Sequence, residues 1–165
     1  MFDLRIITTG GTFDKHYDAV RGELTFHESH LPKILQQART TLSICLEGAL
    51  AVDSLQMTEE ERAAVVEHIG HSTEDRVVVI HGTDTMVKTA TLASENPKTA
   101  GKVVVFTGAM IPYALENSDA EFNLGVAISA VQLLTPGIYV AMGGRIYPYN
   151  HVRKNREKGV FEYVD

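Results

Sequence analysis

The chain has 165 residues, a formal net charge of -6 and an apolar share of 44%. This length is typical of one domain that buries its own core, so we expect a single domain over residues 1–165. The acidic balance, with no long basic run, argues against nucleic acid or an anionic membrane as a partner. No run of about 18 apolar residues indicates a transmembrane helix.

Cys45 is the single cysteine, which excludes an intrachain disulfide and is typical of a reducing compartment. It lies in an apolar run over residues 42–50, and we expect a buried, inert thiol. From Met1 the chain passes directly into an apolar run at residues 4–7, without the charged and apolar regions of a signal peptide. These features together predict a cytoplasmic protein.

Short apolar runs rich in β-branched residues predict four strands, at residues 4–7, 77–80, 103–106 and 138–142. Residues 42–46 and 49–52 are weaker candidates. The four runs are continuous rather than alternating, which is typical of parallel strands buried on both faces.

Helical patterns lie between these runs. Thr58 followed by Glu61 is a capping box, and it predicts a helix that ends at Gly70. Further helices are expected over residues 85–94 and 119–134. Four apolar residues at helical spacing indicate the last helix, which ends before Pro136: Phe122, Val126, Ile128 and Leu133. Strands alternating with helices predict an α/β fold, an open and mostly parallel sheet with helices on both faces.

Residues 13–30 form a polar stretch without clear periodicity. A long polar segment of this kind is either a lid over a binding site or an ordinary surface hairpin, and the residues favour neither. Three histidines lie in it: His16, His27 and His30. Their spacing matches no standard zinc pattern, so we expect surface residues and predict no metal and no cofactor.

Two glycine–threonine segments follow predicted strands. The first turn, residues 8–12, reads Thr-Thr-Gly-Gly-Thr, and the second turn, residues 81–85, reads His-Gly-Thr-Asp-Thr. In open α/β sheets, ligands bind in crevices beyond the carboxyl ends of the strands, so the two turns predict a small-molecule site. A nucleotide-binding, flavodoxin-like domain is a weaker reading, because neither turn carries a Gly-x-Gly-x-x-Gly fingerprint or a Walker lysine.

These turns resemble the two signature segments of the bacterial-type L-asparaginase/glutaminase family, and the string HGTDTM at residues 81–86 is the more specific. Four further stretches resemble other family segments in the same order, at residues 53–58, 107–112, 118–124 and 142–154. The resemblance covers essentially the whole chain. It implies the family's three-layer, flavodoxin-like N-terminal domain.

The resemblance also implies roles for single residues. Thr12 matches the primary nucleophile, and Thr83, Asp84 and Lys154 match a second threonine with its aspartate and lysine. Ser54 matches the group that binds the α-carboxylate of the substrate, and Asp84 also matches the group that contacts its α-amino group.

The chemistry of amide hydrolysis is consistent with these roles. A hydroxyl attacks an amide only when it is activated and when the developing oxyanion is stabilised. A lysine beside a threonine is one activating arrangement. Glycine lets the main chain approach a ligand closely, so N–H groups around Gly11 or Gly82 are candidate substrate-binding and oxyanion donors.

The chain departs from the family in two respects. Family members carry a second, C-terminal domain that completes the site of a neighbouring subunit, and the chain ends where the linker to it would begin. The sequence leaves open whether the chain is naturally short or a fragment. The family also places a lid tyrosine further from the nucleophile than Tyr17 lies here, so Tyr17 is a candidate for that role at a shorter spacing.

The sequence therefore predicts an amidohydrolase that acts on asparagine, glutamine or a related small amide. We expect a homo-oligomer, a dimer or tetramer, in which Tyr147, Tyr149 or the C-terminal tail contributes to a neighbouring site. The alternative is a binding module that holds an amino acid or small carboxylate without turning it over.

Overall fold

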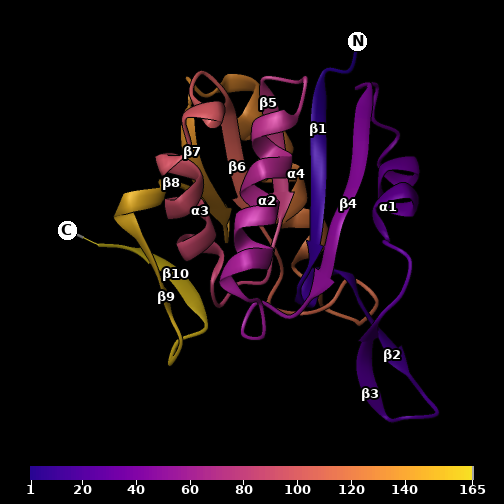
Figure 1. Cartoon of the computed structure of the whole chain (residues 1–165). Coiled ribbons are helices and arrows are strands. Elements are labelled where there is room, and N and C mark those ends of the chain that lie inside the picture. Colours follow the sequence, from indigo (N-terminus) through magenta and orange to yellow (C-terminus); the bar gives the residue numbers. More distant parts are fainter. Residues whose placement is uncertain (165) are drawn as a thin grey trace.

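The structure is a computed structural model that describes residues 1–164, so Asp165, the last residue of the predicted domain, lies outside it. A six-stranded sheet forms the centre of the molecule, in the order β4-β1-β5-β6-β7-β8 (Figure 1). Its strands are β1 (Leu4–Gly10), β4 (Ile44–Val52), β5 (Arg76–Ile80), β6 (Val103–Thr107), β7 (Gly137–Met142) and β8 (Arg145–Pro148). All neighbours pair in parallel except β7 and β8.

The strand predictions are confirmed with one change. The two weak candidates at residues 42–46 and 49–52 form the single strand β4. Two small hairpins lie outside the sheet. Their strands are β2 (Lys15–Asp18) with β3 (Glu23–Phe26), and β9 (Val152–Asn155) with β10 (Val160–Tyr163).

Helices cover both faces of the sheet, as the α/β pattern predicts. They are α1 (Leu31–Ala38), α2 (Glu59–His71), α3 (Met86–Glu95) and α4 (Ala120–Leu133). Short 3-10 turns lie at Thr12–Asp14, Pro97–Thr99 and Tyr149–His151. Helices α2 and α3 pack on one face, and α1 and α4 on the other (Figure 1). The sequence pattern did not predict α1.

Successive residues of the central strands enter opposite cores. Along β5, Val78 and Ile80 pack with α1 and α4, while Val77 and Val79 pack with α2 and α3. Both faces of the strand are therefore dry, which explains why its sequence is continuously apolar.

The capping box of α2 is confirmed. Thr58 Oγ1 accepts a hydrogen bond from the Glu61 N–H at 3.2 Å, and the Glu61 carboxylate accepts one from the Thr58 N–H at 2.9 Å. The helix ends at His71, one residue beyond the glycine at which we expected it to stop.

Helix α4 is confirmed, but the apolar residues that indicated it do not form its buried face. Phe122 and Leu133 are 61% and 85% exposed, and Val126 and Ile128 are only partly buried. Small residues face the sheet instead: Ala120, Ala127 and Ala130, with Asn123, Leu124 and Val131. The three alanines let the helix approach the strands closely.

The crossover through α4 is left-handed. The sheet advances in one direction from β5 to β6 to β7, yet α3 and α4 lie on opposite faces (Figure 1). The crossovers through α1, α2 and α3 have the common right-handed sense, so the one through α4 has the rare sense. The segment between β6 and α4 thereby reaches the first turn, where the Tyr113 N–H donates to the Phe13 carbonyl at 3.1 Å.

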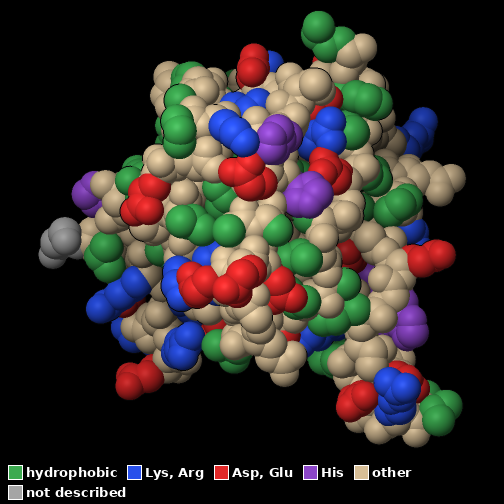
Figure 2. All heavy atoms as spheres, viewed as in Figure 1, with side chains coloured by type: hydrophobic (Ala, Val, Ile, Leu, Met, Phe, Trp, Pro, Cys, Tyr) green, Lys and Arg blue, Asp and Glu red, His purple; other side chains and the backbone are tan. Residues whose placement is uncertain are grey.

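Acidic and basic side chains are interspersed on the face that carries α2, with carboxylates gathered at the start of this helix (Figure 2). Within residues 1–164, no helix is long and apolar enough to cross a membrane. Cys45 is partly exposed on β4, so the expectation of a buried thiol is wrong. Strand β4 lies at the edge of the sheet, which explains this exposure.

Candidate active site

The two turns lie side by side at the carboxyl end of the sheet. Strands β1 and β5 pair in parallel, with Thr8 opposite Ile80, so the segments that follow them emerge together. From β1 the chain returns to the sheet on one side, at β4, and from β5 it returns on the other, at β6. This reversal is a topological switch point, where open α/β sheets bind their ligands.

Backbone packing brings a third segment to the two turns. A Cβ atom added to Gly11 would lie 2.5 Å from the Gly82 nitrogen, and one added to Gly82 would lie 2.5 Å from Ser54 Oγ. Gly11 also has a φ of 72°, in the left-handed region that glycine adopts readily. The first two segments therefore touch through their main chains and the third meets Gly82 through Ser54, so side chains in place of these glycines would separate the segments.

The β9–β10 hairpin carries Lys154 to the second turn. Lys154 Nζ donates hydrogen bonds to Thr83 Oγ1 at 2.8 Å and to Asp84 Oδ1 at 3.0 Å. Arg156 Nε lies 3.4 Å from the same carboxylate oxygen. Thr83 is buried and the Lys154 side chain is 12% exposed, so the hydrogen bond between them is largely shielded from solvent, whereas Arg156 is exposed. The structure thus unites three of the four residues expected to carry catalysis.

Thr12, the fourth, begins the 3-10 turn directly after Gly11. It is partly exposed, and no atom within residues 1–164 hydrogen-bonds to its hydroxyl. Ser54 is 3% exposed, and its hydroxyl likewise has no hydrogen-bond partner in the described part of the chain. Both hydroxyl groups are therefore free to engage a ligand.

The family model described as "Asparaginase, N-terminal" matches residues 3–162. The chain belongs to the asparaginase family. L-asparaginase 1 of Escherichia coli (strain K12) is 32% identical over 159 residues, which cover 87% of this chain and 40% of that protein.

Solved asparaginase structures have the same fold. The thermostable L-asparaginase from Thermococcus kodakarensis aligns with a TM-score of 0.84 at 29% identity, over 98% of this chain and 51% of that one. The probable cytoplasmic L-asparaginase from Campylobacter jejuni aligns with a TM-score of 0.83 at 26% identity, over 100% of this chain and 54% of that one. The chain spans about half the length of these asparaginases.

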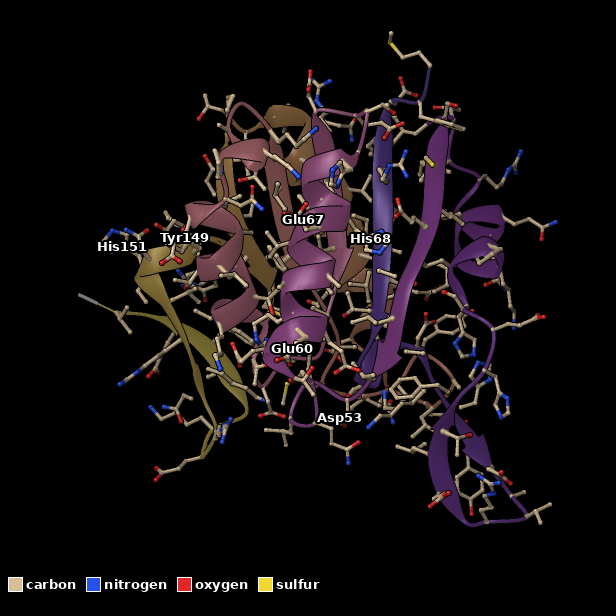
Figure 3. The ribbon with its side chains drawn as sticks, in the orientation of Figure 1. Asp53, Glu60, Glu67, His68, Tyr149 and His151 are labelled. Atoms are coloured by element: carbon tan, nitrogen blue, oxygen red, sulfur yellow. The ribbon has the colours of Figure 1, made fainter. Side chains whose placement is uncertain are left out.

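Lys15 is a charged residue beside the candidate site that sequence reasoning missed. Its Nζ donates to Asp53 Oδ2 at 2.6 Å, which ties the β2–β3 hairpin to the segment before Ser54. Figure 3 places Asp53 beyond the carboxyl edge of the sheet. The hydrogen bond from Lys15 is the main cause that lowers the pKa of Asp53, and the nearby charge of Lys154 acts in the same direction.

Tyr17, the candidate lid tyrosine, lies on β2 of the hairpin that projects from the body of the domain (Figure 1). Its side chain is 59% exposed, and within residues 1–164 its hydroxyl makes no hydrogen bond. The polar stretch is thus a hairpin whose base contacts the site through Lys15. Its tip extends into solvent.

The three histidines gather at the base of this hairpin. The rings of His16 and His30 stack with centroids 3.9 Å apart, and His27 meets His16 edge-on at 5.4 Å. The expectation that all three are surface residues is wrong for His30, whose side chain is 12% exposed because it packs against Asp14 and Tyr113. No group of three or more potential ligands in residues 1–164 is arranged to hold a metal ion.

The tyrosines expected to reach a neighbouring subunit are placed differently. Tyr147 is 1% exposed, and its hydroxyl donates to the Phe161 carbonyl at 2.9 Å. It anchors the β9–β10 hairpin and does not face outward. Tyr149 lines a pocket at the amino ends of β6 and β7, whereas the candidate site lies at the carboxyl ends of the strands. Figure 3 shows it far from Asp53 in that view.

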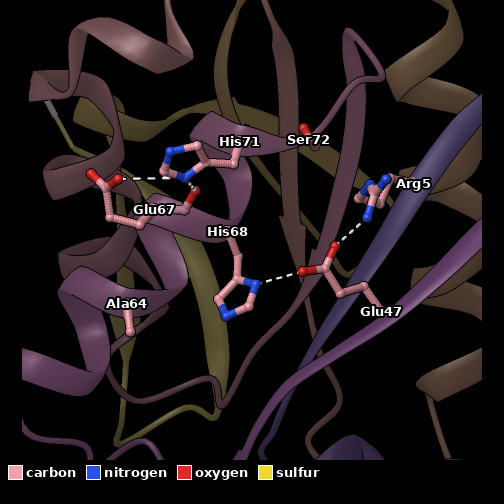
Figure 4. A pocket seen from close by; sticks show the side chains of 7 residues that line it. All are labelled: Arg5, Glu47, Ala64, Glu67, His68, His71 and Ser72. Carbon is pink, nitrogen blue, oxygen red and sulfur yellow. Dashed lines mark hydrogen bonds and ion pairs between the residues drawn. The ribbon is translucent and has the colours of Figure 1, made fainter.

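A second pocket, of about 560 Å³, lies between α2 and the β1–β4 edge (Figure 4). Glu47 accepts hydrogen bonds there from Arg5 and, at 2.5 Å, from His68. Glu74 also pairs with Arg5, at 2.7 Å. Each of these side chains therefore already has a hydrogen-bond partner within the protein.

Proposed function

We propose that the chain carries an amidohydrolase site of the asparaginase type, with Thr12 as the nucleophile. The observation that carries this proposal is the position of Lys154, whose amine bridges Thr83 Oγ1 and Asp84 Oδ1 of the second turn. Family membership supports the reaction class.

The proposed reaction has two stages. The Thr12 hydroxyl attacks the amide carbon of the substrate side chain, its proton passes to the leaving nitrogen, and ammonia departs to leave an acyl ester on Thr12. Water then attacks the ester, which releases the acid and restores the hydroxyl. Thr83 and Lys154 relay the proton in each stage, and Asp84 orients the lysine.

Asparagine, glutamine or a related small amide is the proposed substrate. The free hydroxyl of Ser54 would bind its α-carboxylate, and Asp84 would bind its α-amino group. The Gly11 N–H already donates to the Val52 carbonyl at 2.9 Å, so the second turn, at Gly82 and Thr83, would supply the main-chain N–H groups that donate to the amide oxygen.

The decisive experiment is ammonia release from asparagine and glutamine by the purified chain and by Thr12→Ala. Thr91→Ala, at an exposed threonine of α3, is the matched control. Turnover that is lost in Thr12→Ala and kept in Thr91→Ala supports the proposal. A folded chain that binds aspartate but releases no ammonia overturns it in favour of the binding module.

A cytoplasmic location and a homo-oligomer remain predictions. Apolar side chains are exposed on the segment between β6 and α4 and at the start of α4: Met110, Ile111, Leu115 and Phe122. Self-association that covers them would appear in sedimentation as a dimer or tetramer. A monodisperse monomer with full activity would contradict the oligomer.

A further inference from the structure

A buried arginine on α2 reaches the start of α3. Arg62 is 2% exposed, and its Nη1 donates to Thr89 Oγ1 at 2.6 Å and to Thr85 Oγ1 at 3.2 Å. Its Nε is buried and has no hydrogen-bond partner in residues 1–164; Glu59 Oε1 is 3.7 Å away. A buried charge with an unpaired N–H lowers stability relative to a well-packed apolar side chain. Packing alone therefore does not account for an arginine at this position.

Arg62 sets the direction of a hydrogen-bond chain. A guanidinium only donates, so Thr89 Oγ1 accepts from it and turns its own hydrogen toward His81 Nε2, 2.7 Å away. His81 must then carry its proton on Nδ1, which donates to the Gly82 carbonyl at 2.9 Å. The imidazole is fully buried, and burial lowers the pKa of His81 to about 4. It is therefore neutral at pH 7, as this arrangement requires.

The hydrogen-bond chain ends at the Gly82 carbonyl, and this contact fixes the orientation of one peptide group in the second turn. The Gly82 carbonyl and the Thr83 N–H belong to the same planar trans peptide and point in opposite directions. A carbonyl held toward the His81 ring directs the N–H away from it. No acceptor in the described residues takes this N–H, so it remains available to a ligand. Glycine leaves this peptide free to rotate unless another contact fixes it.

We propose that Arg62 is a positioning residue, which acts through Thr89 and His81 to aim the Thr83 N–H at the amide oxygen of the substrate. This inference rests on the proposed amidohydrolase function. A donor that is already fixed in place stabilises the oxyanion without reorganisation during the reaction. Burial of Arg62 would then lower the stability of the protein but hold the Thr83 N–H in the orientation that the reaction needs.

Two variants interrupt the hydrogen-bond chain, one at Arg62 and one at Thr89. Arg62→Met replaces the donor with an apolar side chain of similar length, and Thr89→Val removes the hydroxyl and keeps the branched shape. Thr89→Ser keeps the hydroxyl and serves as the conservative variant. Thr91→Val repeats the threonine-to-valine change on the exposed side of α3 and is the matched control.

Kinetics separate positioning from a structural role. We expect Arg62→Met and Thr89→Val to lower kcat about tenfold or more, with KM changed less than about twofold, because the donor acts mainly on the transition state. Arg62→Met should keep or raise Tm. Thr89→Ser should recover most of kcat, and Thr91→Val should leave it unchanged. A lower Tm in Arg62→Met and Thr89→Val with unaltered kcat would overturn the proposal.

The amide resonance of Thr83 supplies a readout that does not depend on turnover. In ¹⁵N NMR spectra of the free protein, we expect it to shift and broaden in Arg62→Met and Thr89→Val, and to match wild type in Thr91→Val. If the wild type releases no ammonia, the proposed function fails, and this resonance alone decides the positioning role. An unchanged Thr83 amide in both interrupting variants overturns it.

Discussion

Lys154 Nζ lies 2.8 Å from Thr83 Oγ1, although 71 positions separate the two residues in the chain. One residue follows a central strand of the sheet, and the other lies on a hairpin outside it. The contact depends on the β9–β10 hairpin, which the buried Tyr147 holds against the domain. The proton relay of the proposed reaction runs through this contact.

Replacing Lys154 should therefore abolish most turnover. We expect Lys154→Met to lower kcat/KM by about a hundredfold or more, because it removes the group that exchanges protons with Thr83. Thr83→Val should cost a similar factor, and the double variant little more than either alone, since the two residues act as one unit. Lys158→Met, at an exposed lysine of the same hairpin, should keep full activity. Additive losses in the double variant would contradict the relay.

Gly11 and Gly22 provide a matched pair for the packing of the two turns. Both have positive φ, 72° and 69°, so alanine strains the backbone at each. An added Cβ meets the Gly82 backbone at position 11 and nothing within 4 Å at position 22. We expect Gly11→Ala to destabilise the protein by at least about 1 kcal/mol more than Gly22→Ala, measured by urea unfolding. Equal losses would show that the turns are not in contact.

His81 should make stability depend on pH in a defined window. Burial lowers its pKa in the folded protein to about 4, below the ordinary value of 6.5, so protonation favours the unfolded chain. The free energy of unfolding should be unaffected above pH 6.5 and fall by on the order of 3 kcal/mol between pH 6.5 and 4. His81→Gln should flatten this decline.

Burial also lowers the pKa of His30, so protonation of His30 likewise favours the unfolded chain. The free energy of unfolding of His81→Gln should therefore still decline slightly as the pH falls. Carboxylates such as Glu47 act at lower pH. Burial raises the pKa of Glu47, but hydrogen bonds from His68 and Arg5 more than offset this, so its net pKa is lowered. Its contribution is lost only as pH falls below about 4.5. A decline between pH 6.5 and 4.5 that is identical in wild type and His81→Gln would contradict the assignment to His81.

Asn123 should contribute more to stability than an exposed amide on the same helix. It is 1% exposed; its Nδ2 donates to the Gly108 carbonyl at 3.0 Å, and its Oδ1 accepts from the Gly143 N–H at 3.1 Å. Asn123→Leu leaves both main-chain groups unpaired, so we expect a loss of about 1–3 kcal/mol. Gln132→Leu, at an exposed position of α4, should change the free energy of unfolding by less than about 0.5 kcal/mol. Thermal and urea unfolding of the pair measure the difference.

Local sequence determined the parts of the fold whose physical cause is local. Buried parallel strands require continuous apolar runs, and the capping box of Thr58 and Glu61 forms within one helical turn, so these elements were predictable. The strand-end position of both turns followed from the same patterns. The family resemblance of the turns is confirmed by the match over residues 3–162.

Tertiary structure decided what depends on distant partners. On α4, three alanines with Leu124 and Val131 face the sheet while Phe122 faces outward, a choice that depends on packing against distant strands. The ion pair of Lys15 with Asp53, and the hydrogen-bond chain from Arg62 to His81, join segments that no local pattern links. The sequence by itself named Thr83 and Lys154 as partners only through resemblance. Their contact exists because a hairpin outside the sheet folds back onto the end of β5, a long-range arrangement that chain topology and packing impose together.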